Sequence, residues 1–283
     1  MPDGGIVSDL GGRERFETVS FKVPIDLRDM SGTPYEMTAQ TARSPKSKWR
    51  VIGIPGTPSR PYMWTRFVRK APEDLDVSAV NRAGYGGAWY GTHRRPPVLS
   101  LDDQIAALAP LIEGDDRPAI VVGVSYGGAL SLKAAMEFPR HIKGAVSVAA
   151  LITEPRAYVR ALLPAGDWPI IKQALPCHLH NAIAEVGGRR DQVGAVFSQL
   201  KKYQKPVTIL HGNLDTLVPQ SDAKVLRGYF AQDADVSYQP VNGGTHYLEL
   251  LNVKTVYAAV RDVIKRVENA DSAAEANSIK ATT

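Results

Sequence analysis

Residues 119–129 read AIVVGVSYGGA, and this stretch decides the fold. Ala119 to Val124 is a continuous apolar run, which is typical of a strand buried on both faces of a parallel sheet. The small residues that follow Gly127 predict a helix. Glycines stand two positions before and two positions after Ser125, where a Cβ would collide with the crossing strand or helix. The pattern therefore predicts a sharp strand-to-helix turn with the Ser125 hydroxyl at its apex.

Short apolar runs alternate with helical patterns on both sides of this turn. Seven more strands are expected, at residues 16–23, 35–42, 49–54, 76–81, 144–149, 206–210 and 236–241. Helices are expected at residues 61–70, 101–112, 127–138, 221–230 and 249–267. Such alternation predicts an α/β fold, with a mostly parallel central sheet and helices on both faces.

One block breaks the rhythm. Residues 151–202 have helical patterning without a clear strand, which predicts a small helical lid inserted after the sixth strand. The fold core would then comprise residues 15–150 and 203–268. Residues 1–14 are glycine-rich and charged, and residues 269–283 are polar without an aromatic residue, so both ends are expected to be loose.

Bulk composition excludes several classes of protein. Of the 283 residues, 44% are hydrophobic and 22% are charged, as in an ordinary globular chain. The single cysteine, Cys177, rules out an intrachain disulfide and a cysteine-rich zinc site. Next to it, His178 and His180 form no second ligand pair, so neither a metal nor a cofactor is expected.

The charge and hydropathy patterns address partners and location. The net charge is +5, but the basic residues are dispersed among acidic ones, so nucleic-acid binding is not predicted. No apolar stretch approaches the roughly 18 residues of a membrane span. The first residues show no secretory signal, so the expected location is the cytoplasm.

Two later turns supply an acid and a base. The stretch PVTILHGNLDTLVP, residues 206–219, places Asp215 just beyond a strand, and Gly243-Gly244-Thr245-His246 places His246 just beyond the next one. The carboxyl ends of parallel strands meet at one edge of a sheet, where such folds build their sites. A serine hydroxyl needs an imidazole to take its proton, and a carboxylate to orient that imidazole. Glu249 is a rival acid, but it opens the last helix and is more simply a first-turn carboxylate.

These motifs, taken together, resemble the α/β-hydrolase superfamily over about residues 16–268. The resemblance rests on the serine turn and on His211-Gly212-x-x-Asp215-x-x-Val218-Pro219. It implies that Ser125 is the nucleophile, Asp215 the orienting acid and His246 the general base and acid. Residues 81–87 resemble the family's turn after the fourth strand, which we interpret as structural.

The same resemblance implies an oxyanion hole built from two backbone amides. One amide belongs to Tyr126, the residue after the nucleophile. The other is expected in Pro55-Gly56-Thr57-Pro58, where the family usually has His-Gly. Pro58 has no N–H to donate, so Thr57 is the expected donor.

The pocket is expected to be mainly apolar. Four residues near the predicted site or in the lid are assigned to substrate binding: Met63, Trp168, Val218 and Tyr247. No arginine clamp for an anionic acid is visible, which favours a small-molecule, ester-like substrate.

The leading functional hypothesis is a carboxylic-ester hydrolase acting through an acyl-enzyme on Ser125. The same three side chains would serve the hydrolysis of a carbon–carbon bond, lactone, amide or thioester. A serine at the turn argues against epoxide and haloalkane hydrolysis, which use an aspartate nucleophile. A non-catalytic binding protein on the hydrolase fold is the alternative from another class, although such proteins typically lose one of the three residues.

Overall fold

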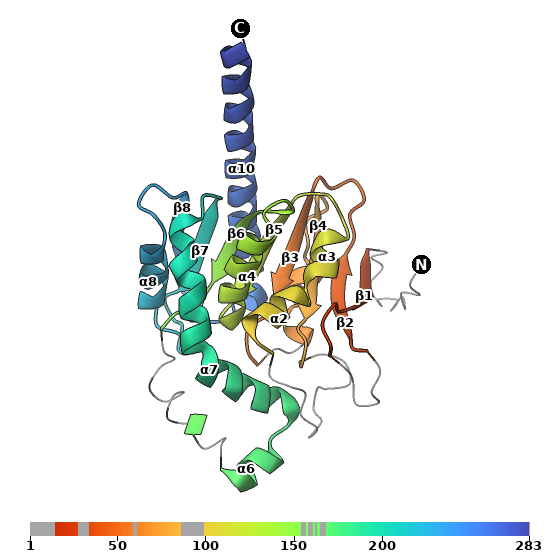
Figure 1. Cartoon of the computed structure of the whole chain (residues 1–283), viewed down its shortest axis with the longest axis vertical. Helices are drawn as coiled ribbons and strands as arrows, with labels where there is room; N and C mark the ends of the chain where they lie inside the picture. Colours follow the sequence, from red (N-terminus) through yellow and green to blue (C-terminus); the bar gives the residue numbers. More distant parts are fainter. Residues whose placement is uncertain are drawn as a thin grey trace.

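Eight strands form one twisted sheet, shown in Figure 1. The computed structural model describes residues 15–27, 34–58, 61–85, 99–153, 157, 161, 163–164 and 168–282. The strands are β1 (Phe16–Lys22), β2 (Glu36–Ala42), β3 (Trp49–Ile54), β4 (Leu75–Asn81), β5 (Ala119–Val124), β6 (Ile142–Val148), β7 (Val207–Gly212) and β8 (Val236–Val241). Their spatial order is β1-β2-β4-β3-β5-β6-β7-β8. Only the β1–β2 and β2–β4 pairs are antiparallel, which confirms the predicted mostly parallel sheet.

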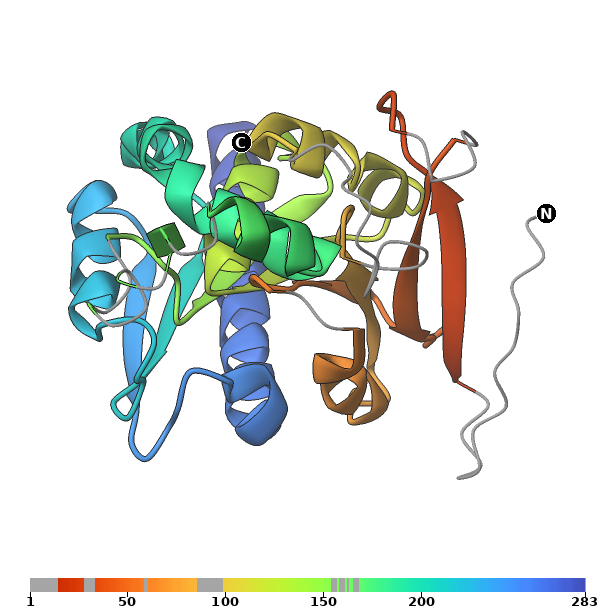
Figure 2. The same cartoon turned by 90° about the horizontal axis from the view of Figure 1, so that it is seen from below.

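Helices cover both faces of this sheet, as Figure 2 shows from below. The helices and 3-10 turns are η1 (Pro61–Met63), α1 (Thr65–Arg69), α2 (Leu101–Ala106), α3 (Ala109–Glu113), α4 (Tyr126–Glu137), α6 (Pro169–Ala174), α7 (Cys177–Gln199), η4 (Leu200–Lys202), α8 (Ser221–Tyr229), α9 (Leu248–Leu251) and α10 (Val253–Thr282). One apolar core joins the sheet to α2, α3, α4, α7 and α8. The other core joins it to α1, α9 and α10.

The central strand β5 shows why its sequence is apolar at every position. Val121 packs into the first core, whereas Ile120, Val122 and Val124 pack into the second. Successive side chains on a strand point to opposite faces, so a strand covered on both faces needs apolar residues throughout. This burial confirms the prediction from the AIVVGV run.

Some predicted helices are divided in the structure. Residues 101–112 form α2 and α3 in place of one helix, and Pro110 stands in the first turn of α3. Proline lacks an N–H and fits the first turn of a helix better than its interior, so it favours a new start there. Residues 61–70 likewise form η1 followed by α1.

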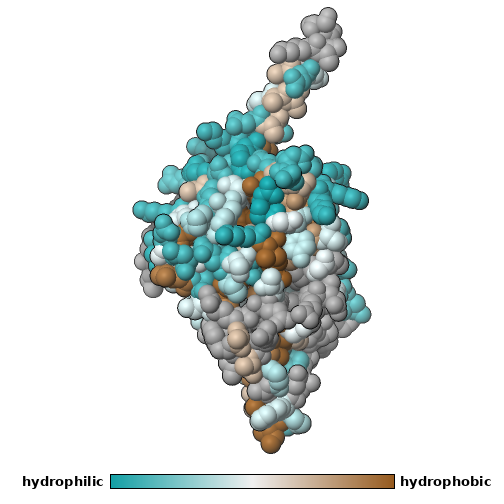
Figure 3. Space-filling model, turned by 90° about the vertical axis from the view of Figure 1, so that its left-hand side faces the viewer, coloured by the Kyte–Doolittle hydropathy of each residue, from teal (hydrophilic) through white to brown (hydrophobic). Residues whose placement is uncertain are grey.

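Between β6 and β7 the chain leaves the sheet, as the sequence predicted. The described part of residues 151–202 contains α6, α7 and η4. Asp222 of α8 anchors the start of this segment: its buried carboxylate accepts hydrogen bonds from the backbone N–H groups of Ile152 and Thr153, at 2.8 and 2.9 Å. The molecule's lower tip, where α6 lies in Figure 1, is coloured hydrophobic in Figure 3. Trp168 and Ile170 are exposed there.

The C-terminal end differs from the prediction. The sequence predicted a helix ending near residue 267 and a loose end at 269–283, but α10 continues to Thr282. The segment after Val267 contains no glycine or proline and is rich in alanine, so nothing local ends the helix. Residues 268–278 are exposed, and Figure 1 shows this end projecting from the body. None of the helices within the described ranges combines the length and hydropathy of a membrane-spanning segment. Residues 1–14, also predicted to be loose, lie outside the described residues.

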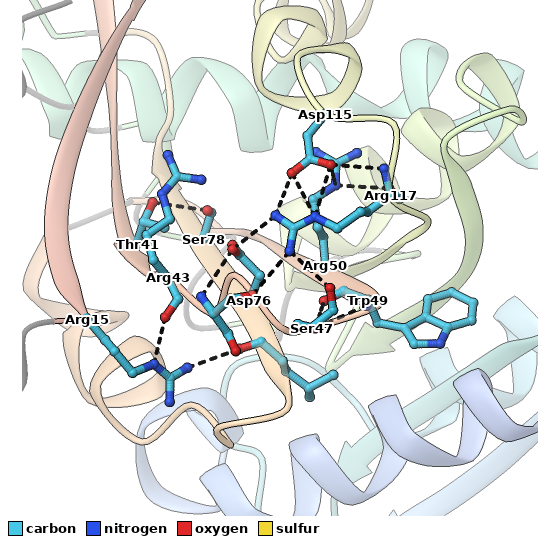
Figure 4. A network of polar contacts seen from close by, with 12 residues as sticks. Arg15, Thr41, Arg43, Ser47, Trp49, Arg50, Asp76, Ser78, Asp115 and Arg117 are labelled. Carbon is cyan, nitrogen blue, oxygen red and sulfur yellow. Dashed lines mark hydrogen bonds and ion pairs between the residues drawn. The ribbon is translucent and has the colours of Figure 1, made fainter.

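A polar network braces the amino-terminal ends of the central strands, shown in Figure 4. Arg50 at the start of β3 donates to the carbonyls of Leu111 and Ile112 at 3.0 and 2.7 Å, and so caps the end of α3. Arg117, before β5, pairs with the buried Asp76 of β4 at 3.1 Å. This network lies at the edge of the sheet opposite the carboxyl ends of these strands.

Candidate active site

Ser125 occupies the turn between β5 and α4. Its backbone has φ 56° and ψ −123°, a conformation that residues with a side chain rarely adopt. Strain of this kind costs about 1–3 kcal/mol and persists only where the surroundings enforce it. The predicted strand-to-helix turn is therefore present, and it holds Ser125 in a strained conformation.

The two glycines of the turn are required by close packing. A Cβ added to Gly123 would lie 2.0 Å from the carbonyl oxygen of Gly127. A Cβ added to Gly127 would lie 2.2 Å from the carbonyl oxygen of Ile54, at the end of β3. Gly56, in the turn after β3, also has no room for a side chain, since an added Cβ would lie 2.9 Å from the Cβ of Ser125. These contacts place the turn after β3 directly beside Ser125.

Asp215 and His246 come from the loops after β7 and β8, which pack against each other. Leu214 N–H donates to the carbonyl of Gly244 at 2.9 Å. His246 Nδ1 lies 2.7 Å from Oδ2 of Asp215, and both side chains are buried. An ionised carboxylate only accepts hydrogen bonds, so Nδ1 carries a proton, and Nε2 of the neutral imidazole is then an acceptor. The structure thus brings together the predicted acid and the predicted base.

The surroundings of Asp215 favour its ionised form. Its Oδ1 accepts hydrogen bonds from the N–H groups of Leu217 and Val218 at 2.8 and 2.9 Å. His211 lies within β7, and its Nε2 is 3.4 Å from Asp215 Oδ2. Burial by itself raises the pKa of Asp215, but the hydrogen bonds from His211 and His246 outweigh it and leave the pKa below its usual value.

Ser125 and His246 line the same cavity, which has a volume of about 400 Å³. Predicted residues Thr57, Met63 and Tyr247 line it too. The described residues that line it are Pro55, Gly56, Thr57, Pro58, Tyr62, Met63, Trp64, Val124, Ser125, Leu217, His246, Tyr247, Glu249 and Leu250.

Two residues assigned to substrate binding lie outside this lining. Val218 is only 2% exposed and is not among the lining residues, whereas its neighbour Leu217 lines the cavity. Trp168 is 65% exposed at the start of α6. Both Leu217 and Val218 are apolar and both donate their N–H to Asp215, so the sequence does not indicate which of the two faces the cavity.

The two amides predicted for the oxyanion hole belong to residues beside Ser125. Tyr126 is the first residue of α4, where N–H groups have no acceptor within the helix. Thr57 follows Gly56, which packs against Ser125. The Thr57 hydroxyl is held at 2.7 Å from the hydroxyl of Tyr85.

Glu249 lines the cavity, and the sequence does not indicate how deeply it is buried. It lies in α9, three residues after His246, and is only 2% exposed. Within the described part of the chain, its buried Oε2 has no hydrogen-bond partner. Burial raises the pKa of Glu249 to about 7, and a hydrogen bond from its own backbone offsets only part of this shift.

Replacing Glu249 with glutamine is expected to stabilise the protein at alkaline pH. Between about pH 4.5 and 7 the unfolded chain ionises this carboxyl while the folded chain keeps it protonated, so stability falls as pH rises. Above pH 7 the ionised Glu249 carboxylate lowers the stability of the folded protein by the full amount, on the order of 3 kcal/mol. Urea unfolding of Glu249→Gln should therefore show a gain at about pH 8 that vanishes near pH 4.5. An equal difference in the free energy of unfolding at both pH values would contradict this prediction. Glu113 is exposed, so Glu113→Gln is the control.

Comparison with known proteins agrees with this architecture. Residues 51–250 match the model of the Alpha/beta hydrolase family. The chain is 28% identical to Lipase LipV of Mycobacterium tuberculosis over 129 residues, which are 44% of this chain and 47% of that protein, so the match spans about half of the relative.

Two solved structures illustrate the likeness in fold. The peroxisomal alpha-beta-hydrolase Lpx1 from Saccharomyces cerevisiae aligns with a TM-score of 0.64 at 12% identity, covering 89% of each chain. The carboxylesterase CesB from Bacillus subtilis aligns with a TM-score of 0.59 at 15% identity, covering 88% of this chain and 92% of that one. Because the family match extends from β3 to α9 and so takes in both strand-end loops and the serine turn, the chain belongs to the alpha/beta hydrolase family.

Proposed function

We propose that this protein is a carboxylic-ester hydrolase that acts through an acyl-enzyme on Ser125. The observation that carries the proposal is the 2.7 Å contact between His246 Nδ1 and Asp215 Oδ2 at a cavity that Ser125 also lines. That contact leaves Nε2 of His246 as the proton acceptor for a serine hydroxyl. Asp215 orients the imidazole and stabilises its charged form.

In the first half-reaction the ester acylates the serine. Ser125 Oγ bonds to the carbonyl carbon, the serine proton passes to His246 Nε2, and the carbonyl electron pair moves to oxygen. The resulting oxyanion is held by the amides of Thr57 and Tyr126. When the carbonyl re-forms, the bond to the alcohol oxygen breaks, and His246 returns its proton to that leaving group.

In the second half-reaction water removes the acyl group. His246 takes a proton from water as the water oxygen bonds to the acyl carbon, and the same amides hold the second oxyanion. Collapse releases the carboxylic acid, while Ser125 Oγ recovers a proton from His246. The enzyme returns to its starting state, so no cofactor is consumed.

The lining of the cavity favours a neutral ester of modest size. Apolar side chains such as Met63, Trp64 and Leu250 form much of its wall, and no lysine or arginine occurs among the lining residues that the structure describes. A volume of about 400 Å³ is at the small end of ligand sites. The partial match to a protein named as a lipase also supports an ester substrate.

A fluorophosphonate probe tests the nucleophile directly. The Ser125 oxygen would displace fluoride from phosphorus and leave a stable phosphonate on the protein. We expect mass spectrometry to find one label, on Ser125, in folded protein and none after denaturation, with Ser131→Ala labelled like the wild type. Absence of a label on folded protein would favour a non-catalytic binding role.

A panel of substrates separates the reactions that one triad can catalyse. Short-chain esters are expected to give a higher kcat/KM than matched lactones, amides, thioesters and vinylogous diketones. Discrimination is judged by the ratio of kcat/KM values, because that ratio compares transition states. A diketone or thioester turned over faster than every ester would replace the proposed reaction with that one.

A further inference from the structure

A buried ion pair joins α7 to the end of β4. Arg82, just after β4, donates to both carboxylate oxygens of Glu185, from Nη1 at 2.9 Å and from Nη2 at 3.0 Å. The exposed fractions of the two side chains are 2% and 5%. A paired geometry of this kind gives strong hydrogen bonds with a fixed orientation.

Glu185 accepts two further hydrogen bonds. The Tyr85 hydroxyl donates to it at 2.8 Å, and Nε2 of Gln104 donates at 3.2 Å. One carboxylate from α7 thus gathers three side chains from the turn after β4 and from α2. A buried charge without hydrogen-bond partners is costly. While α7 is packed in place, the three donors are therefore held in the arrangement that satisfies the Glu185 carboxylate.

Two paths lead from this carboxylate to the turn beside Ser125. Arg82 Nη2 also donates to the carbonyl of Gly56 at 2.8 Å. The Tyr85 hydroxyl lies 2.7 Å from the hydroxyl of Thr57. Both paths end on adjacent residues, one of which carries an amide proposed to bind the oxyanion.

A third path reaches the other proposed donor. Gln104 Nε2 lies 3.5 Å from the Tyr126 hydroxyl, and the Arg82 guanidinium lies 5.2 Å from the centre of the Tyr126 ring. Burial, followed by the charge of Glu185, raises the pKa of Tyr126 to about 12, so its hydroxyl stays protonated. The network therefore restrains the side chains of Thr57 and Tyr126 together.

We infer that Glu185 is a positioning residue for the oxyanion hole, acting through Arg82, Tyr85 and Gln104 on the backbone of Thr57 and Tyr126. The inference rests on the proposed function, because it assigns a role within that reaction. It also means that the oxyanion hole reaches its working geometry only with α7 docked on the core. Glu185 itself is not among the described residues that line the cavity, which separates its role from that of a substrate-binding residue.

The test compares the affinity for an inhibitor that forms a tetrahedral adduct with the binding of the uncharged ester substrate. A short-chain alkyl trifluoromethyl ketone accepts Ser125 Oγ at its carbonyl carbon, the serine proton passes to His246, and the carbonyl oxygen becomes an oxyanion. Its affinity therefore depends on the oxyanion hole, whereas the KM of an ester reports mainly on the uncharged substrate when chemistry is slow. The inhibition constant of this ketone and the kcat and KM for the best ester are measured on full-length variants.

Glu185→Gln keeps the shape of the side chain and removes its charge. We expect kcat to fall by about 10- to 100-fold and ketone affinity to fall by a similar factor, because misplaced donors lose much of their effect. KM should stay within about three-fold of the wild type. Unchanged ketone affinity in folded Glu185→Gln would overturn the inference.

Asp76→Asn is the matched control, because Asp76 is a buried carboxylate in the polar network at the opposite edge of the sheet. It should lower thermal stability while kcat and ketone affinity per folded molecule stay unchanged. An equal loss of ketone affinity in Asp76→Asn would also overturn the inference, since the effect would then be general destabilisation. If Glu185→Gln does not fold, Tyr85→Phe cuts the path to Thr57 alone, and the same two measurements apply to it.

The wild-type protein separates this inference from the proposed function. If it neither hydrolyses esters nor reacts with the fluorophosphonate, the proposed function fails first. If it does both and Glu185→Gln behaves like the wild type, only the positioning role fails.

Discussion

Ser125→Ala is expected to reduce kcat for the best ester by about 10⁴- to 10⁶-fold. The variant keeps the cavity, the Asp215–His246 pair and the amides beside the turn, but it has no oxygen to attack the carbonyl carbon. A residual rate above the uncatalysed reaction should persist, because oxyanion binding and substrate positioning survive without the nucleophile. Steady-state kinetics with purified protein, together with loss of fluorophosphonate labelling, would measure the effect.

The backbone of the same residue provides an internal check. Ser125→Gly should lose activity like the alanine variant yet gain about 1 kcal/mol of stability, since glycine adopts φ 56° and ψ −123° without a Cβ penalty. Ser131→Ala, six positions further along in α4, should behave like the wild type in both assays. Ester hydrolysis at the wild-type rate by Ser125→Ala would remove Ser125 as the nucleophile.

Asp215→Asn is expected to lower kcat by about 10⁴-fold with little change in fold. Two backbone N–H groups donate to Oδ1, so the asparagine will place its carbonyl oxygen there and its NH₂ group toward His246. That NH₂ group is a donor, which forces His246 Nδ1 to become an acceptor and puts the ring proton on Nε2. Nε2 can then no longer take the serine proton. Kinetics and circular dichroism on the purified variant would check both parts.

His211 offers the matched control for this prediction. It is the second histidine beside Asp215 Oδ2, but it is fully buried and lies outside the residues that line the cavity. His211→Gln should lower stability and reduce kcat by less than about ten-fold. If His211→Gln lost as much activity as Asp215→Asn while staying folded, His246 would no longer be the preferred base.

Local pattern was sufficient to predict the centre of the fold. β5 is apolar at every position because both faces of the sheet are covered, and that requirement is visible in six consecutive residues. The serine turn was predictable for the same reason, since Gly123 and Gly127 meet each other and the end of β3. In both cases the residues that make the contacts also form a recognisable pattern within a few positions of the sequence.

Contacts between segments far apart in the chain are not visible as a local sequence pattern. Glu185 and Arg82 are 103 residues apart, and a glutamate within a polar helix has the appearance of a solvated side chain. The turn containing Arg82 and Tyr85 was interpreted as structural, whereas the structure joins both residues to the Gly56–Thr57 turn. Glu249 is a first-turn carboxylate, of α9, as the sequence predicts, but its burial depends on the packing around that helix and was not predicted. Side-chain direction and burial depend on what packs across the gap, which a single sequence does not display.

The direction of α10 has a practical consequence. Val256, Val260 and Val263 are buried against the sheet, so the first half of the helix is fixed to the core. Its exposed continuation after Val267 leaves the body at the end opposite α6, as Figure 1 shows, and rises by about 1.5 Å per residue. A resin, chip surface or fusion partner attached through this rod would lie on the side away from the carboxyl ends of the strands, where the site residues are. Immobilisation by this route should therefore leave the catalyst facing the bulk liquid.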